Sequence, residues 1–368
     1  MEQFIMKTKV YMGKAALSHL EELPIQRALV ICDPFIKESG MLRLVTGHLE
    51  QKQVAYETFS EVIPDPDIAV VTKGIGQMAA CDPDTLIAVG GGSALDTAKA
   101  IRYIVEQSGE KKHCRLIAIP TTSGTGSEVT SFAVISDPDK NVKYPLRDDA
   151  MVPDVAMLDP ELTRSVPPAI TADTGMDVLT HALEAYVSVR ACDFGDAFAE
   201  KAVKLIFDYL PVAVSQGNDS YARERVHNAS CMAGVAFNST SLGLCHGMAH
   251  AMGARFHISH GKSNAMLLSH IISYNASVSD ERYHELAGML GIASSTPKAS
   301  ALGLARRVSQ LQEKIGIPQK ITELGIEKSA FLDAIPEMAK TALADPCTQT
   351  NPRTPSQEDI ERIFAKLV

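Results

Sequence analysis

The chain has 368 residues, of which 45% are hydrophobic and 21% charged, and its formal net charge is −9. This length suffices for two domains with sizeable cores, and the composition excludes a largely disordered chain. The acidic balance, without any segment dense in lysine and arginine, argues against nucleic acid or an anionic membrane as a partner.

Three further features bear on localisation. No apolar run approaches the roughly 18 residues that a membrane-spanning helix requires. The first residues, MEQFIMK, lack the apolar core of a secretory signal. The seven cysteines are scattered and form no CxxC pair, which predicts free thiols in a reducing compartment. We therefore expect a cytoplasmic protein.

The first half of the chain alternates between short apolar runs and helical patterns. Strands are predicted at residues 27–33, 54–60, 85–89, 115–119 and 155–158, helices at 68–80 and 94–105, and a hairpin from 132–135 and 142–144. Continuous apolar strands separated by helices are typical of a mainly parallel sheet covered on both faces.

The pattern changes after Pro167 and Pro168, because from about Thr171 onward only helices are predicted. We therefore expect two domains. Residues 1–168 would form an α/β domain with a mainly parallel sheet, and residues 169–368 an all-helical domain.

Two loops in the first half have the composition of phosphate-binding loops. Gly90-Gly91-Gly92-Ser93 separates a predicted strand from a helix, where backbone N–H groups and the helix dipole favour a pyrophosphate. Thr121–Glu128 follows the next strand and contains only Gly, Ser and Thr before its final glutamate. Ligands gather at the carboxyl ends of parallel strands, so the two loops together predict a dinucleotide site. Capping boxes are also expected, from Ser93 with Asp96 and from Thr125 with Glu128.

Asp33 ends the first clear strand. An acid at this position can accept hydrogen bonds from a ribose diol and would repel a 2′-phosphate, which favours NAD over NADP. A simple helix cap is the alternative role for Asp33.

The second half contains candidate metal ligands. Asp177 and His181 are four residues apart in an apolar helix and so share one face. A buried carboxylate is costly unless it is paired or bound to a metal. A structural Asp–His hydrogen bond is the alternative, so further ligands must decide between the two.

A histidine cluster supplies such ligands, since His246, His250, His257 and His260 all lie between Leu244 and Gly261. On one straight helix His246 and His260 would be roughly 21 Å apart, too far to share an ion. The chain must therefore bend between them, and residues 253–259 are the expected place. The spacing alone leaves the choice between His257 and His260 open. One aspartate and three imidazoles would suit Fe(II), Zn(II) or a similar divalent ion.

At this point the sequence resembles the iron-containing (group III) alcohol dehydrogenase family. The matching motifs are GGGSALDTAKAI, IPTTSGTGSEVT, TGMDVLTHALEAY, HGMAHAMGARFHISHG and DPCTQTNPR, in this order along nearly the whole chain. The segments IPTTSGTGSEVTS and VISDPDKNVKYPL resemble the propanol dehydrogenases of bacterial propanediol-utilisation microcompartments.

The resemblance implies a dinucleotide-binding domain followed by a helical metal-binding domain, with NAD and Fe²⁺ (or Zn²⁺ or another divalent metal) as cofactors. It implies that the metal ligands are Asp177, His181, His246 and His260, with His250 near the nicotinamide as a non-ligand. We expect His250 to be the catalytic residue, in a relay for the alcohol proton, with the ribose as the alternative route. It implies cofactor contacts from Asp33, Gly91, Gly92, Ser93, Thr121, Thr122 and Lys143. It places Phe132, Phe237 and Cys347 near the substrate.

The expected activity is hydride transfer between NAD(H) and a short-chain primary alcohol or aldehyde. Propanal and 1-propanol are the expected substrate pair. The alternatives within the family are a lactaldehyde reductase and a 1,3-propanediol or ethanol dehydrogenase. Outside that class stand a non-catalytic NAD-binding module and a microcompartment structural protein. A homodimer or higher homo-oligomer is expected, with microcompartment proteins as further partners.

Overall fold

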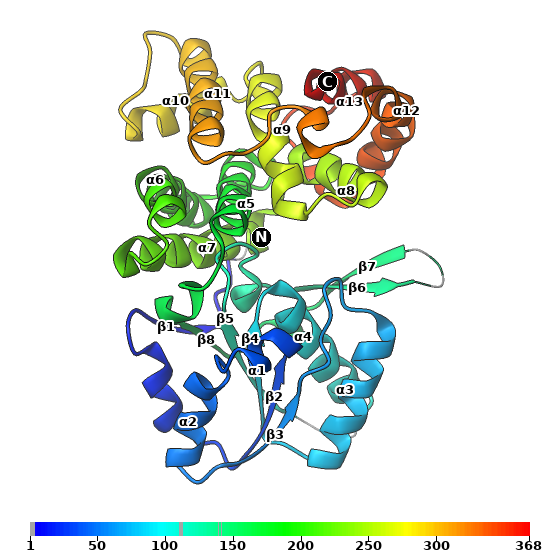
Figure 1. Ribbon diagram of the computed structural model, residues 1–368. Coiled ribbons are helices and arrows are strands. Elements are labelled where there is room, and N and C mark those ends of the chain that lie inside the picture. The colour runs from blue at the N-terminus through cyan, green and yellow to red at the C-terminus, as the bar shows by residue number, and fades with distance from the viewer. Residues whose placement is uncertain (1–3, 110–112, 139, 141) are drawn as a thin grey trace. The chain divides into compact units, whose positions relative to one another are not determined.

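The computed structural model describes residues 4–109, 113–138, 140 and 142–368. The chain divides into two compact units, Met1–Ser165 and Val166–Val368 (Figure 1).

A parallel six-stranded sheet, counted over the described residues, forms the centre of the first unit, in the order β1-β8-β5-β4-β2-β3. Its strands are β1 (Lys9–Met12), β2 (Arg27–Cys32), β3 (Ala55–Phe59), β4 (Thr85–Gly90), β5 (Arg115–Pro120) and β8 (Val155–Leu158). The predicted mainly parallel α/β architecture is confirmed. The sequence prediction missed β1, because this short edge strand has no fully apolar run.

Alternating side chains of the strands build two cores, one on each face of the sheet. Leu29 and Ile31 pack with α3 (Ile68–Cys81) and α4 (Gly92–Gln107), whereas Val30 packs on the other face with α2 (Arg43–Gln51). Figure 1 shows α2 on one side of the sheet and α3 and α4 on the other. Since successive residues of a strand point to opposite faces, a strand buried on both sides must be apolar throughout.

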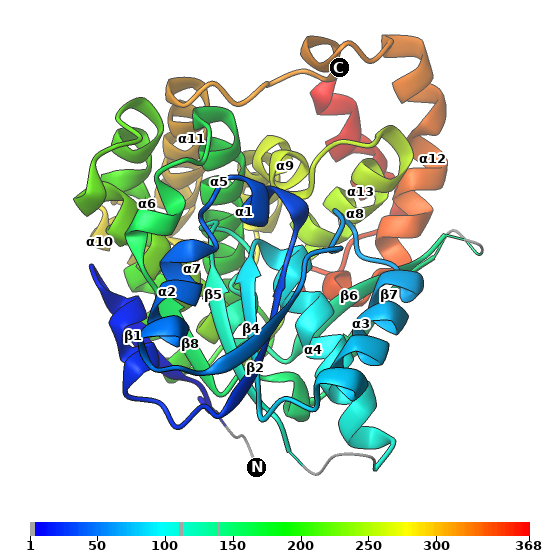
Figure 2. The same cartoon turned by 60° about the horizontal axis from the view of Figure 1, so that its bottom comes forward.

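Shorter elements complete this unit. The antiparallel hairpin of β6 (Phe132–Asp137) and β7 (Val142–Arg147) is confirmed, and β6 packs against α3 and α4 (Figure 2). The remaining helices are η1 (Ala16–Glu21), α1 (Pro34–Glu38), η2 (Ser127–Val129), η3 (Asp149–Met151) and η4 (Pro160–Thr163).

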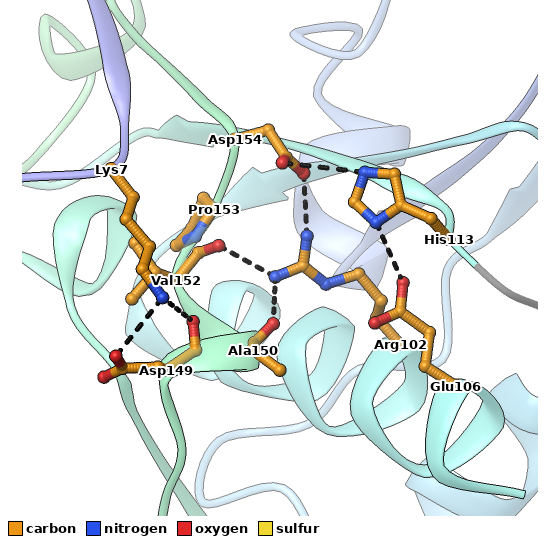
Figure 3. A pocket seen from close by; sticks show the side chains of 9 residues that line it. All are labelled: Lys7, Arg102, Glu106, His113, Asp149, Ala150, Val152, Pro153 and Asp154. Carbon is orange, nitrogen blue, oxygen red and sulfur yellow. Dashed lines mark hydrogen bonds and ion pairs between the residues drawn. The ribbon is translucent and has the colours of Figure 1, made fainter.

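A small polar pocket lies at the amino ends of β5 and β8 (Figure 3). The guanidinium of Arg102 is buried there and donates to Asp154 Oδ2 at 2.8 Å and to the carbonyl of Val152 at 2.8 Å. Asp154 Oδ2 also accepts from the backbone N–H of Leu116 at 2.8 Å. The charged groups of the pocket thus pair with one another, which indicates that they fix the start of β8 against α4.

The second unit consists of helices throughout, as predicted. They are α5 (Pro168–Val187), α6 (Asp193–Ser215), α7 (Ser220–Thr240), α8 (Leu244–Phe256), α9 (His260–Asn275), α10 (Asp280–Met289), α11 (Pro297–Lys314), η5 (Ile321–Leu324), α12 (Lys328–Ala344), η6 (Pro346–Thr350), α13 (Gln357–Phe364) and η7 (Ala365–Leu367). Helix α5 packs against α6, α7 and α9, and α8 packs against α9, α12 and η6. Within the described residues, no helix combines the length and hydropathy needed to span a bilayer.

Candidate active site

Close packing requires glycines in the turn that follows β4, residues 90–92, which we call the glycine turn. A Cβ on Gly90, whose φ is +154°, would lie 2.7 Å from the Cβ of Ala94, and one on Gly92 would lie 2.8 Å from Cγ2 of Thr125. Helix α4 begins at Gly92 with Gly91 as its N-cap, and no side chain caps it. The first backbone N–H groups of the helix are therefore not taken by a capping side chain, as an anion site needs.

Both predicted capping boxes are wrong. Asp96 turns away from Ser93 and accepts instead from Ser127 Oγ at 2.7 Å and from the backbone N–H of Val134 at 3.0 Å. The short helix η2 has Gly126 at its N-cap without a side-chain bond. For Asp96, long-range partners replace the expected local pairing. In the second loop the N-cap position falls on Gly126, and Thr125 Oγ1 accepts from the backbone N–H of Ser127 at 3.3 Å.

The second loop, after β5, lies directly beside the glycine turn. The backbone N–H of Thr121 donates to the carbonyl of Gly90 at 3.0 Å. Thr122 Oγ1 lies 3.4 Å from the place that a Cβ on Gly91 would occupy. The predicted cofactor residues Gly91, Gly92, Ser93, Thr121 and Thr122 thus come from neighbouring strand ends of one sheet.

A buried lysine connects these loops, and sequence reasoning missed it. Lys99 Nζ donates to Ser127 Oγ at 2.7 Å, to Thr130 Oγ1 at 3.2 Å and to the carbonyl of Phe132 at 2.8 Å. Burial lowers the pKa of Lys99 to about 8, although Asp96 and Glu128 act to raise it. The sequence feature that could have indicated a buried role for Lys99 is its position among the apolar residues of the ALDTAKAI segment.

Asp33 has a defined place at the end of β2. Its Oδ1 accepts from the backbone N–H of Ile36 at 2.9 Å, so it caps α1. Its Oδ2 lies 3.6 Å from the position of a Cβ on Gly90, next to the glycine turn. The cap and a contact with a ribose are therefore compatible roles. For the predicted cofactor residue Lys143, the backbone pairs with Ser136, while its side chain lies outside what the structure describes.

The four predicted metal ligands come together in the second unit. The ligand atoms of Asp177, His181, His246 and His260 all lie within 4.8 Å of one another, and we call this set the metal cluster. Helix α5 supplies Asp177 and His181 from one face, α8 supplies His246, and His260 begins α9.

The predicted bend between the histidines is confirmed. Helix α8 ends at Phe256, His257 adopts the left-handed region with φ of +54°, and α9 begins at His260. This turn brings His260 back toward α5, with His260 Nε2 3.5 Å from Asp177 Oδ1. The side chain of His257 is exposed and does not belong to the cluster.

Two buried polar side chains form hydrogen bonds to members of the metal cluster. Glu184 accepts from the backbone N–H groups of Gly243 at 2.9 Å and Cys245 at 2.6 Å, and a 2.6 Å hydrogen bond joins its Oε2 to His246 Nδ1. Burial raises the pKa of Glu184 to about 8, although these backbone donors act to lower it. Asn264 Nδ2 donates to Asp177 Oδ1 at 2.8 Å. Sequence reasoning missed both; for Glu184 the signal was its position three residues after His181.

These residues fit a divalent metal ion. Among the described residues, His246 Nε2 is buried without a hydrogen-bond partner, 3.8 Å from Asp177 Oδ1. Burial and the neighbouring histidines lower the pKa of His246 well below its ordinary value, so its imidazole is neutral. A neutral imidazole is the form that binds a metal, and three imidazoles with one carboxylate suit Fe(II) or Zn(II).

The other predicted site residues of this unit lie around the metal cluster. The ring of Phe237 stacks on His181 with centroids 4.5 Å apart, and the ring of His250 stacks on His260 at 5.3 Å. His250 Nδ1 is hydrogen-bonded to Asp345 Oδ2 at 2.8 Å, and Cys347 lies beside Asp345.

The remaining predicted substrate residue, Phe132, belongs to the first unit. It begins β6, and its ring lies 4.9 Å from the guanidinium carbon of Arg147.

Comparison with known proteins gives the family. Residues 7–160 match the family model described as iron-containing alcohol dehydrogenase, and residues 171–368 match the model for the C-terminal part of the Fe-containing alcohol dehydrogenase family. A 1-propanol dehydrogenase, PduQ of Salmonella typhimurium, is 46% identical over 373 residues, covering 100% of both chains. The NADPH-dependent butanol dehydrogenase of Clostridium saccharobutylicum is 38% identical, covering 99% of this chain and 97% of its own.

The fold agrees with these matches. The crystal structure of a 1,3-propanediol oxidoreductase superposes with a TM-score of 0.94 at 32% identity and covers 100% of both chains. The resemblance inferred from the motifs is confirmed along the whole chain. The chain belongs to the iron-containing alcohol dehydrogenase family and is an oxidoreductase of alcohols.

Proposed function

We propose that this enzyme interconverts a short, unbranched primary alcohol and its aldehyde with NAD(H) and a divalent metal, 1-propanol and propanal being the best pair. The observation that carries the proposal is the set of donor atoms from Asp177, His181, His246 and His260, all within 4.8 Å of one another, three of them on buried side chains and His260 open to solvent. The 46% identity to a 1-propanol dehydrogenase over the full chain supports this substrate.

The reaction must remove a hydride from C1 of the alcohol and a proton from its hydroxyl group. A nicotinamide cofactor, held by the loops that follow β2, β4 and β5, would supply the hydride acceptor for alcohol oxidation and the hydride donor for aldehyde reduction. A divalent ion, which we assign to the four residues of the metal cluster with Fe²⁺ as the family's metal, would supply Lewis acidity toward the alcohol oxygen.

Residues of the chain would guide the hydroxyl proton and exclude water. We assign the proton relay to His250, whose ring orientation is set by the 2.8 Å hydrogen bond from Nδ1 to Asp345. Phe237, stacked on His181, presents an apolar surface beside the donor atoms. This surface would keep water away from the reacting carbon and favour an alkyl chain.

The cofactor contacts are assigned to the loops at the carboxyl ends of β2, β4 and β5. The pyrophosphate would lie at the N-terminus of α4, against Gly91, Gly92 and Ser93, with Thr121 and Thr122 alongside. Asp33 would face the ribose. The preference for NAD is part of the proposal, since one of the relatives is named as NADPH-dependent.

A substrate panel tests the proposal. Purified, iron-loaded enzyme is assayed with NADH for kcat/KM on ethanal, propanal, butanal, lactaldehyde and glyceraldehyde. Each buried CH₂ contributes about 0.8 kcal/mol, so propanal should exceed ethanal by a few-fold. Hydroxylated aldehydes should react poorly, because each hydroxyl left without a partner costs roughly 1–3 kcal/mol. A clear preference for lactaldehyde or glyceraldehyde would overturn the substrate assignment.

We further propose that the enzyme forms a homo-oligomer and associates with microcompartment proteins. The sequence resemblance of residues 119–131 and 134–146 to microcompartment propanol dehydrogenases supports this association. Light scattering of the purified protein tests the oligomeric state. Recovery of the protein with isolated microcompartments tests the association.

A further inference from the structure

A second group of metal-binding side chains lies next to the metal cluster and shares no residue with it. The ligand atoms of His250, Asp345 and Cys347 lie within 4.8 Å of one another, and we call this set the thiol cluster. Helix α8 supplies His250, Asp345 follows α12, and Cys347 belongs to η6.

The backbone holds the thiol cluster together. Cys347 N–H donates to Asp345 Oδ1 at 2.8 Å, and Thr348 Oγ1 donates to the carbonyl of Ala342 at 2.7 Å. Helices α8 and η6 approach so closely that a Cβ on Gly247 would lie 2.1 Å from Thr348 Oγ1. Glycine at position 247 therefore permits the approach that sets the distance between His250 and Asp345.

The chemistry of the donor set selects a cation class. An imidazole, a carboxylate and a thiolate together suit Zn²⁺ and other thiophilic divalent ions, whereas Mg²⁺ and Ca²⁺ prefer oxygen ligands alone. Three protein ligands leave a fourth position for water. The side chain of His250 is 43% exposed, so a cation can reach the set from solvent.

The charges of the thiol cluster also allow both sites to be filled. Binding would release the thiol proton of Cys347, and the proton between His250 Nδ1 and Asp345 would move to Nε2 of the same ring. The resulting thiolate and carboxylate would balance the two positive charges of the ion. A second cation would thus add little net charge beside the metal cluster, whose His260 ring stacks on His250.

We propose that His250, Asp345 and Cys347 form a second cation site, which takes Zn²⁺ or a similar thiophilic ion and thereby inhibits the enzyme. The binding rests on the geometry of the thiol cluster alone. The inhibition rests on the proposed function, because the ion would occupy the nitrogen that holds His250 to Asp345 and would lie where we expect the substrate.

Cobalt titration of the full-length protein tests the binding, because the metal cluster contains no thiol. Two equivalents of Co²⁺ should produce a sulfur-to-cobalt charge-transfer band that one tight equivalent does not. The band should vanish in Cys347→Ser and weaken in His250→Ala, and it should persist in His181→Ala, which disrupts only the metal cluster. Cys192→Ser, the other partly buried cysteine, is the matched control and should keep the band.

A charge-transfer band that persists in Cys347→Ser, or the absence of the band at two equivalents of Co²⁺, would overturn the second site.

The inhibition is tested by assaying the iron-loaded enzyme at increasing Zn²⁺ concentrations. The rate of each variant is expressed relative to its own rate without added zinc. Cys347→Ser should require at least about ten-fold more zinc, because losing even a hydrogen-bonding partner of a metal ligand costs 10–100-fold in affinity. A normal charge-transfer band without aldehyde reduction would uphold the site while contradicting the proposed function. A band with undiminished activity at saturating zinc would overturn the inhibition.

Discussion

At the scale of single residues, Glu184 shows how His246, a proposed metal ligand, is held in place. Its carboxylate contacts His246 and also the backbone N–H groups of Gly243 and Cys245 at the start of α8. The hydrogen bond at Nδ1 leaves Nε2 of His246 directed at the other ligands. Carboxylate partners of this kind orient metal-binding imidazoles and increase their basicity.

We predict that Glu184→Ala lowers metal affinity by roughly 10–100-fold, the usual cost of losing such a partner. Glu184→Gln should lose less, because its amide oxygen can still accept from a backbone N–H group. The measurement is competition with a chromogenic chelator for Fe²⁺ or Zn²⁺. Glu281→Gln, at an exposed position of α10, is the matched control. Wild-type affinity in a folded Glu184→Ala protein would contradict the positioning role.

Asp33 caps α1 and is also proposed to face the ribose, and different substitutions can separate the two roles. Asp33→Asn keeps an oxygen that can cap α1 but removes the charge that we expect to face the ribose. We predict that it increases the ratio of NADPH to NADH specificity without lowering Tm. Asp33→Gly should relax the specificity further, with a stability loss of only a few tenths of a kcal/mol from the cap. The kcat/KM ratio for the two cofactors decides this, and a wild-type enzyme that already prefers NADPH would refute the assignment.

At the scale of elements, helix α4 contacts both of the proposed cofactor loops, which follow β4 and β5. Its N-terminus faces the glycine turn, while Lys99 on its buried side holds the segment from Ser127 to Phe132. Asp96, one turn earlier, ties the same helix to Ser127 and to β6. The loops around the proposed pyrophosphate site are therefore positioned by side chains of one helix.

Lys99→Met should weaken both stability and cofactor binding. Removing this charge leaves Asp96 and Glu128 buried without its compensation, which costs about 3–5 kcal/mol for a broken buried pair. We expect a lower urea midpoint and a raised KM for NADH. Lys73→Met, on the exposed surface of α3, is the control. An unchanged KM together with the stability loss would show that the network serves the fold alone.

At the scale of the whole molecule, the proposed cofactor and metal residues belong to two separately packed units. We therefore predict that the two binding functions can be lost independently. His260→Ala should lose metal, measured by elemental analysis, and still bind NADH by fluorescence. Gly92→Val should lose NADH binding, because the added side chain would clash with Thr125, and should retain metal.

His257→Ala is the matched control for the metal arm, since His257 is exposed just before α9. It should keep full metal content. Full metal in His260→Ala, or metal loss confined to His257→Ala, would show that the wrong histidine has been assigned. Loss of both ligands in either variant would contradict the independence of the two units.

Much of this fold could be predicted from the sequence, because the relevant signals are local. The apolar runs at residues 85–89 and 115–119 reflect strands buried on both faces, and the spacing of Asp177 and His181 reflects one helix face. The need for a bend before His260 followed from helix length alone. In each case, residues near one another in the chain carried the information.

Only the tertiary structure decided which distant groups meet. Glu184 lies 62 residues from His246, Asp345 lies 95 residues from His250, and Lys99 lies 31 residues from Thr130. The turn at His257 brought His260, and not His257, beside Asp177. The capping box of Ser93 and Asp96 is absent because Asp96 has buried partners from a distant segment, and buried polar groups are satisfied wherever packing brings a partner. No local spacing carries that information.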